Sequence, residues 1–230
     1  WKKTRWCLVR VPNESLAQQA KTNYETLENM FFSACFRNWE QESETWKQWA
    51  KTLSSGNDIR IIGKRTDLSF SVKNRTWVPF AGINNMPDGE IATAPVTSTV
   101  TGSIRFEHPG VLGGRFIHDI CLTWEKGVLV EATSSTEQAF LKSIITKDEG
   151  ASCIGEFAFG TNYGVDRFCN DILLDEKIRG TIHIALGRAY PECGGKNKSA
   201  IHWDIIKDLR MEGSVLLDGK PILKNGKILL

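Results

Sequence analysis

The sequence lacks several features that mark common classes of protein. Its 230 residues carry a formal net charge of only +2, and no block of five like charges occurs. A nucleic-acid-binding surface normally appears in a sequence as a basic run or stripe, so we expect no nucleic-acid partner. All apolar runs are far shorter than the roughly 18 residues of a membrane-spanning helix, so we expect no membrane partner either.

The sequence also lacks cysteine pairs with C-x-x-C spacing. Its six cysteines stand at positions 7, 35, 121, 153, 169 and 193, and no two of them have C-x-x-C spacing. Because both a zinc ribbon and a thioredoxin-type redox centre require C-x-x-C pairs, the sequence excludes both kinds of site. We expect reduced, mostly buried thiols in a cytoplasmic protein. The chain begins Trp1-Lys2-Lys3, with neither an initiator methionine nor a signal-peptide core, and we therefore expect a fragment of a longer protein.

Two kinds of residue pattern divide the chain. Good helix formers and apolar residues at helical spacing predict helices over residues 13–54, with Asn13 as an N-cap. From residue 58 onward, alternating apolar and polar residues predict strands. The prediction is an α+β fold: a strand and helical segment (1–56), followed by a mixed or antiparallel β-rich domain (57–230). The helical stripe includes three tryptophans that we expect in the core: Trp39, Trp46 and Trp49.

Histidine is scarce, with four residues in the chain. In the expected strand T-I-H-I-A-L, His183 alternates with isoleucines and so faces away from the apolar side. His202 and Asp204 stand two apart in another expected strand, so they project to the same side. Trp203 between them projects to the opposite side, where we expect it to pack in the core. The pair suits a metal ion or a catalytic site, but it needs partners from elsewhere in the chain.

The other two histidines are weaker candidates. His108 precedes a proline and a glycine, so we expect it in a loop. His118 lies on an apolar face of an expected strand, so we expect it in the core. The pattern alone leaves structural roles open for the stronger candidates as well. His183 also suits an ordinary strand histidine, and the pair His202 and Asp204 also suits a structural ion pair.

Two glutamates stand in apolar, glycine-flanked contexts. Glu90 lies in M-P-D-G-E-I-A-T-A-P, and Glu156 lies in C-I-G-E-F-A-F-G. An unpaired buried carboxylate is costly, so each residue suits either a buried salt bridge or a metal site. Imidazole and carboxylate ligands together favour zinc, cobalt or manganese. Two glutamates, two histidines and one aspartate exceed the needs of one tetrahedral ion, and they suit two ions that share a bridging carboxylate.

Four stretches of the chain, taken in order, have the pattern of one known family. They are M-P-D-G-E-I-A-T-A-P (86–95), G-E-F-A-F-G-T-N (155–162), D-E-K-I-R-G-T-I-H-I-A-L-G-R-A-Y-P (175–191) and N-K-S-A-I-H-W-D (197–204). With these motifs the chain resembles the thermophilic-type metallo-aminopeptidases, peptidase family M29. Weaker similarity, including D-L-S-F-S-V (67–72), extends over nearly the whole chain. Two features depart from the family: its members carry a further N-terminal α/β segment, and the interval between Tyr190 and His202 is shorter here.

The resemblance implies a two-metal aminopeptidase that releases single amino acids from peptides with a free N-terminus. It implies two divalent ions (Zn, Co, Mn or Mg), with Tyr190 as the active-site tyrosine. The sequence does not determine which carboxylate bridges the ions; our expectation is Glu156. The resemblance also implies a homodimer. Two alternatives stay open: another two-metal amidohydrolase, or a non-catalytic metal-binding fragment. The implied metal ligands are Glu90, Glu156, His183, His202 and Asp204.

Overall fold

A computed structural model describes residues 4–230; residues 1–3, where the predicted N-terminal segment starts, lie outside the described residues. The helices are α1 (Glu14–Gln19), α2 (Tyr24–Cys35), α3 (Trp39–Leu53), α4 (Gln138–Ile145) and α5 (Ile172–Asp175). The first three confirm the predicted helical region. Each begins after an asparagine whose side-chain oxygen accepts a hydrogen bond from a backbone N–H of the first turn: Asn13, Asn23 and Asn38. These caps fix the start of each helix because the first N–H groups lack partners within it.

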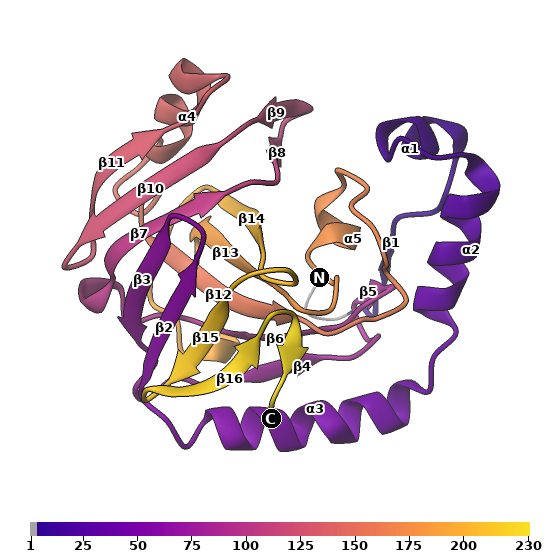
Figure 1. Ribbon diagram of the computed structural model, residues 1–230, viewed down its shortest axis with the longest axis horizontal. Coiled ribbons are helices and arrows are strands. Elements are labelled where there is room, and N and C mark those ends of the chain that lie inside the picture. Colours follow the sequence, from indigo (N-terminus) through magenta and orange to yellow (C-terminus); the bar gives the residue numbers. More distant parts are fainter. Residues whose placement is uncertain (1–3) are drawn as a thin grey trace.

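Most strands form two antiparallel sheets. The larger sheet has the order β11-β10-β7-β3-β2-β15-β16-β17. Its strands are β2 (Asp58–Gly63), β3 (Thr66–Ser71), β7 (Thr101–Phe106), β10 (Ile120–Glu125), β11 (Val128–Thr133), β15 (Ser214–Leu217), β16 (Lys220–Lys224) and β17 (Lys227–Ile228). Every pairing in it is antiparallel. α3 runs along one end of the sheets, and α1 and α2 stand at their side (Figure 1).

The smaller sheet has the order β14-β13-β12-β6-β4 and is also antiparallel throughout. Its strands are β4 (Val78–Phe80), β6 (Glu90–Thr93), β12 (Ile154–Gly160), β13 (Thr181–Gly187) and β14 (His202–Asp208). Two short pairs complete the strands: β1 (Leu8–Val9) with β5 (Asn85–Met86), and β8 (Gly110–Leu112) with β9 (Arg115–Ile117). Helices with mixed, mainly antiparallel sheets confirm the predicted α+β fold.

The main core lies where the two sheets face each other. Phe70 of the larger sheet and Phe157 of the smaller sheet pack edge to face, with ring centroids 5.2 Å apart. Trp203 is fully buried in this core, as predicted. A second apolar cluster joins α1 and α2 to the 161–180 segment, the connection between β12 and β13. Both faces of β12 and β13 are therefore covered, and every residue of these two strands is buried.

The prediction for His118 was wrong, because the strand is broken beside it. β9 ends at Ile117 and β10 begins at Ile120, and Asp119 between them has φ of 57°. A residue in this left-handed conformation interrupts the alternation of strand side chains. His118 is consequently exposed, whereas Ile117 and Ile120 are buried.

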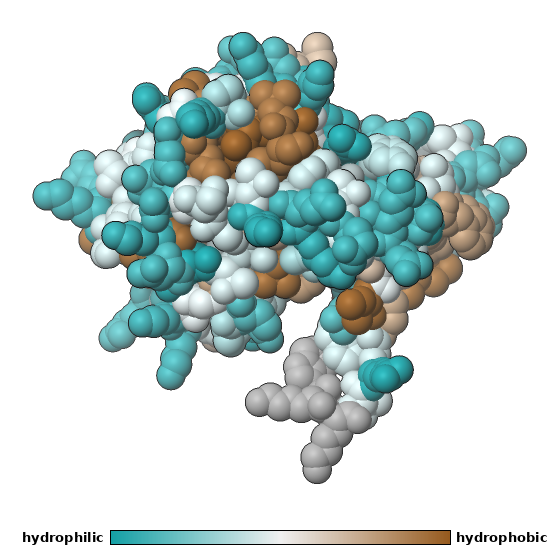
Figure 2. Space-filling view, turned by 90° about the horizontal axis from the view of Figure 1, so that it is seen from below, coloured by the Kyte–Doolittle hydropathy of each residue, from teal (hydrophilic) through white to brown (hydrophobic). Residues whose placement is uncertain are grey.

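One face of the protein is mainly polar (Figure 2), and α3 packs on the same core as the strands. None of the helices within residues 4–230 is both long and apolar enough to cross a membrane. The face seen in Figure 2 is largely hydrophilic, with hydrophobic side chains gathered in separate patches. Trp46 and Leu53 of α3 lie in the same core as the strands. The boundary near residue 56 stays a prediction.

Candidate metal centre

One face of the smaller sheet gathers all five predicted ligands. Glu90 begins β6, Glu156 lies in β12, His183 lies in β13, and β14 carries His202 and Asp204. In the sheet register, Ala185 of β13 lies directly opposite Glu156 of β12 on one side and Asp204 of β14 on the other. Residues directly opposite each other on antiparallel strands project to the same face. The predicted side chains therefore converge on the face that turns away from the main core.

The convergent side chains form two groups, each with ligand atoms within 4.8 Å of one another. We call Glu90, Glu176 and His183 the inner triad, since all three are buried. We call Glu156, His202 and Asp204 the rim triad, because the His202 side chain keeps 13% of its surface exposed.

Glu156 connects the two triads. Its Oε1 atom lies 3.6 Å from Nε2 of His183, and its Oε2 atom lies 3.2 Å from Nε2 of His202. One carboxylate thus presents one oxygen to the imidazole of each triad. Glu156 therefore lies between the two imidazoles.

Small residues form the surface beneath the triads. Ala158 lies opposite His183 and Ala92, and Ala185 lies opposite Glu156. We call these three alanines the alanine floor. All are fully buried, and their short side chains leave the space above the sheet to the longer ligand side chains. A larger residue at any of them would project into the centre of the site.

Glu176 and Lys177 were missed by the sequence analysis. They follow α5 in the 161–180 segment, which folds back over the sheet. Gly160 permits this approach, because a Cβ atom there would lie 2.1 Å from the carbonyl oxygen of Ile178. The run D-E-K resembles a solvated surface stretch, since three charged residues in succession are usually exposed. The sequence does carry one signal that the D-E-K run is buried: apolar residues flank it on both sides. These residues, Leu174 and Ile178, are buried in the structure.

The carboxylates of the inner triad have opposite pKa shifts. Burial alone would raise the pKa of Glu90, but Lys177 and His183 outweigh burial and hold it at about 2. Burial raises the pKa of Glu176 to about 8, and the Lys177 ammonium offsets only part of that increase. In the rim triad, burial raises the pKa of Asp204, whereas His183 and His202 lower that of Glu156 in spite of its burial.

Both imidazoles have raised pKa values in the metal-free protein. Burial opposes their protonation, but for His183 the neighbouring Glu156 and Glu90 outweigh it and raise the pKa well above 6.5. For His202, Glu156 and Asp204 likewise outweigh burial and raise the pKa to about 9. Protons therefore occupy the ring nitrogens that would face a metal ion.

The residues present fit divalent metal ions. Within residues 4–230, Nδ1 of His183 is a buried atom without a hydrogen bond. Oε2 of Glu90 and Oε2 of Glu156 also form no hydrogen bond of ordinary geometry, although they lie 3.0 Å from Nζ of Lys177 and 3.2 Å from Nε2 of His202. Buried polar atoms are normally satisfied, and metal coordination is one way to satisfy them. Nδ1–H of His202 donates to the carbonyl of Arg188 over 2.7 Å, which leaves Nε2 as the ligand atom. Such outer contacts commonly orient a metal-bound histidine.

Tyr190 lies at the edge of the rim triad. Its ring centroid is 4.9 Å from that of His202 and 6.2 Å from that of Phe80. Burial raises the pKa of its hydroxyl, and the charges of Glu156 and Asp204 raise it further. The hydroxyl therefore keeps its proton throughout the neutral range and can act as a hydrogen-bond donor.

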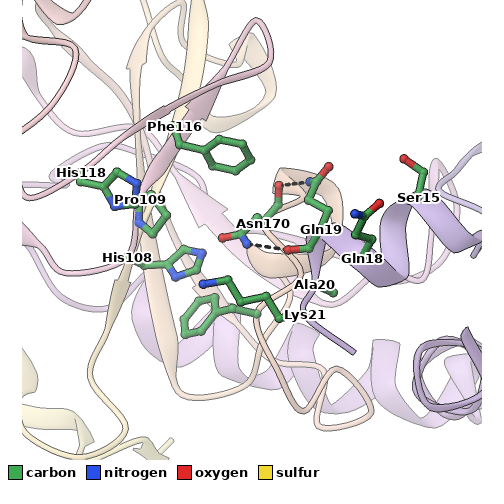
Figure 3. Close-up of a pocket in the computed structure, with 11 residues that line it drawn as sticks. Ser15, Gln18, Gln19, Ala20, Lys21, His108, Pro109, Phe116, His118 and Asn170 are labelled. Atoms are coloured by element: carbon green, nitrogen blue, oxygen red, sulfur yellow. Dashed lines mark hydrogen bonds between the residues drawn. The ribbon is translucent and has the colours of Figure 1, made fainter. Parts of the chain in front are cut away.

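A sizeable cavity lies outside this site. Its volume is about 700 Å³, it lies between α1 and the loops around β8 and β9, and none of the five predicted ligands lines it (Figure 3). His108 lies in a loop here, as predicted, and its Nε2 is 3.3 Å from Asp175. Its ring stacks on Phe168 with centroids 3.8 Å apart. His108 thus has structural partners, and the triads remain the stronger candidate for chemistry.

Comparison with known proteins identifies the family of this chain. The family model described as thermophilic metalloprotease (M29) matches residues 1–228, so the chain belongs to this family. The family predicted from the four motifs is confirmed. Membership of a metalloprotease family implies divalent metal cofactors, and the two triads provide side chains suited to hold them.

The relatives are named as aminopeptidases. Aminopeptidase PepS of Streptococcus thermophilus is 25% identical over 96% of this chain and 62% of its own length. Aminopeptidase T of Thermus thermophilus is 34% identical over 62% of this chain and 40% of its own length. The structure of wild-type AmpT from Thermus thermophilus matches with a TM-score of 0.79 at 25% identity, over 90% of this chain and 59% of that one. The chain thus spans less than two thirds of these relatives.

A second solved structure has the same fold. The 2,5-dihydroxypyridine dioxygenase from Pseudomonas putida KT2440 matches with a TM-score of 0.71 at 17% identity, over 96% of this chain and 69% of that one. A likeness at this identity concerns the fold alone. Function must therefore be argued from the side chains of the site.

Proposed function

We propose that this chain forms the catalytic part of a two-metal aminopeptidase. One observation carries the proposal: the two triads, which meet over one face of the smaller sheet, are connected by the two oxygens of Glu156. We propose Glu90, Glu156, His183, His202 and Asp204 as ligands and add Glu176 to the inner triad. Peptides with a free N-terminus are the proposed substrates, in agreement with the aminopeptidase names of the relatives. The homodimer implied by the family resemblance stays a prediction.

The charge of the site supports two ions rather than one. The site contains five buried carboxylates. Four belong to the triads, and Asp88 lies beside the inner triad: Asp88, Glu90, Glu156, Glu176 and Asp204. Lys177 is the buried ammonium among them. When both imidazoles are neutral, five carboxylates and one ammonium leave four negative charges. Two divalent ions neutralise these charges. A single ion would leave two buried charges, which is costly, and protonation of Glu176, whose pKa is about 8, would remove only one of them.

The side chains of the centre suit peptide hydrolysis. Bound divalent ions supply Lewis-acid chemistry, because they lower the pKa of water and polarise a carbonyl group. Glu156 holds the two triads at a fixed separation and presents an acceptor oxygen to each. Tyr190 keeps its proton and donates a hydrogen bond to the negative charge that develops on the scissile carbonyl oxygen. Removal of one such donor typically costs about 3 kcal/mol of transition-state stabilisation.

Metal content and peptide cleavage test the proposal together. We expect about two Co²⁺ or Zn²⁺ ions per chain after reloading and dialysis, and release of the first residue from a leucyl tripeptide. The same peptide with an acetylated N-terminus should resist cleavage. Cleavage of both peptides alike would favour another two-metal amidohydrolase, and absence of stoichiometric metal would refute the two-metal centre.

A matched pair of aspartate variants separates ligands from neighbours. Asp204→Asn removes a proposed ligand, whereas Asp208→Asn alters a carboxylate on the same face of β14. Asp208 pairs with Arg210 at 2.8 Å and belongs to neither triad. We expect Asp204→Asn to lose one ion and Asp208→Asn to keep both. Equal metal content in the two variants would contradict the assignment of Asp204.

A further inference from the structure

Lys177 is a buried cation at the inner triad. Its side chain has no exposed surface, and its Nζ lies 2.7 Å from Oε1 of Glu176 and 3.0 Å from Oε2 of Glu90. A third carboxylate oxygen, Oδ1 of Asp88, lies 3.6 Å away. Two of these three partners belong to the inner triad. Because each carboxylate has two oxygens with about four acceptor positions, it can contact an ammonium and a metal ion together.

Asp88 is held in place independently of Lys177. Its Oδ2 accepts a hydrogen bond from the backbone N–H of Gly82, and its Oδ1 accepts one from that of Gly89, both at 2.9 Å. The Asp88 carboxylate is thus a fixed anchor for the ammonium. Lys177 in turn reaches from this anchor to Glu90 and Glu176, which come from different parts of the chain.

A second buried lysine provides a contrast. Lys207 of β14 is also buried, but on the opposite face of the same sheet. Its Nζ donates to the backbone carbonyls of Lys64 and Arg105 and pairs with a single carboxylate, Glu107, at 2.9 Å. Lys207 therefore connects strands and loops. Lys177 contacts carboxylates that surround a candidate metal position.

We propose that Lys177 is a positioning residue that orients Glu90 and Glu176 for one of the two metal ions. This inference rests on the proposed two-metal centre. At Glu90 the ammonium contacts Oε2 at 3.0 Å, the same oxygen that lies 3.3 Å from Nε2 of His183, so Lys177 holds the oxygen that faces the inner triad. It also offsets the charge of Asp88, so each triad offers a net charge of −2 to one divalent ion. Outer partners of this kind commonly contribute 10- to 100-fold to metal affinity.

The test compares Lys177→Met with Lys207→Met by Co²⁺ titration, followed by visible absorption and by native mass spectrometry. We expect Lys177→Met to weaken one of the two ions about 10- to 100-fold and Lys207→Met to leave both affinities unchanged. Lys177→Arg, which keeps the charge, should restore part of the affinity. Equal or tighter binding by Lys177→Met would overturn the proposal.

Single-triad backgrounds locate the effect. In a His202→Ala chain the inner triad stays intact, and there Lys177→Met should lower Co²⁺ affinity. In a His183→Ala chain the rim triad stays intact, and there Lys177→Met should have no effect. An equal loss in both backgrounds would indicate general destabilisation and refute a positioning role.

Two further controls keep the test decisive. If Lys177→Met does not fold, Asp88→Asn/Lys177→Met removes both members of an opposite-charge pair, and the same loss of affinity at one ion is expected. Normal affinity in this double variant would overturn the proposal. The unsubstituted chain separates the two hypotheses: if it binds no metal, the proposed function fails. If it and Lys177→Met bind two ions alike, only the role of Lys177 fails.

Discussion

Metal binding should be strongly coupled to proton release, and the structure gives the magnitude. The pKa of His202 is about 9 in the metal-free protein, so its imidazole is protonated in about 99% of molecules at pH 7. Nδ1 donates to Arg188, so the proton that a ligand metal must displace is the one on Nε2. Because pH 7 lies two units below this pKa, removal of the Nε2 proton costs about 2.7 kcal/mol, which lowers the metal affinity roughly a hundredfold. His183, whose pKa is also raised, adds to the effect.

Calorimetry in buffers with different ionisation enthalpies measures this coupling. We expect Co²⁺ binding at pH 7 to release at least two protons and its affinity to rise from pH 7 to pH 9. His202→Ala should release about one proton fewer. Buffer-independent heats, or an affinity that stays flat between pH 7 and pH 9, would refute the reasoning.

The same pKa shift has an opposite effect on the metal-free fold. A folded pKa of about 9, above the ordinary 6.5, means that imidazolium pairing at His202 stabilises the fold fully below pH 6.5. That stabilisation is lost as the pH rises through 9. Metal-free protein should therefore be less stable to urea at pH 9 than at pH 6.5, and the difference should shrink in His202→Ala.

Three substitutions test other parts of the structure. Tyr190→Phe should keep both metal ions and lower kcat by about 10²- to 10³-fold; unchanged kcat would exclude its role as a donor. Gly160→Ala should displace the segment at Ile178, since the new Cβ would lie 2.1 Å from its carbonyl oxygen; Co²⁺ affinity should fall, and normal affinity would contradict the close approach. Trp203→Ala should lower the free energy of unfolding by about 3–5 kcal/mol because Trp203 is fully buried, as urea denaturation would measure.

The sequence predicted the parts of the site that lie on regular strands. Side chains in a strand alternate between two faces, so the apolar neighbours of His183 were enough to place it opposite the core. The two-residue spacing of His202 and Asp204 placed them on a common side in the same way. Both placements agree with the observed sheet register.

The parts that failed lie where the backbone is irregular. At Asp119 a positive φ resets the alternation, so His118 turns to solvent. Glu176 and Lys177 follow a four-residue helix in a long connection, where no periodicity predicts which side chains point inward. Their burial depends on contacts of the whole connection, including its approach to Gly160.

The positions of the ligands along the chain determine when the site can form during folding. Glu90, Glu156 and His183 come from strands separated by long connections, and they meet only after the smaller sheet has assembled. Before that sheet has formed, only His202 and Asp204 are close together through the sequence, and two ligands are too few to hold a divalent ion firmly. Metal ions should therefore leave the folding rate nearly unchanged and slow unfolding instead, since contacts that form after the transition state act on the unfolding rate. Metal loading would then lengthen the lifetime of the folded chain against proteolysis.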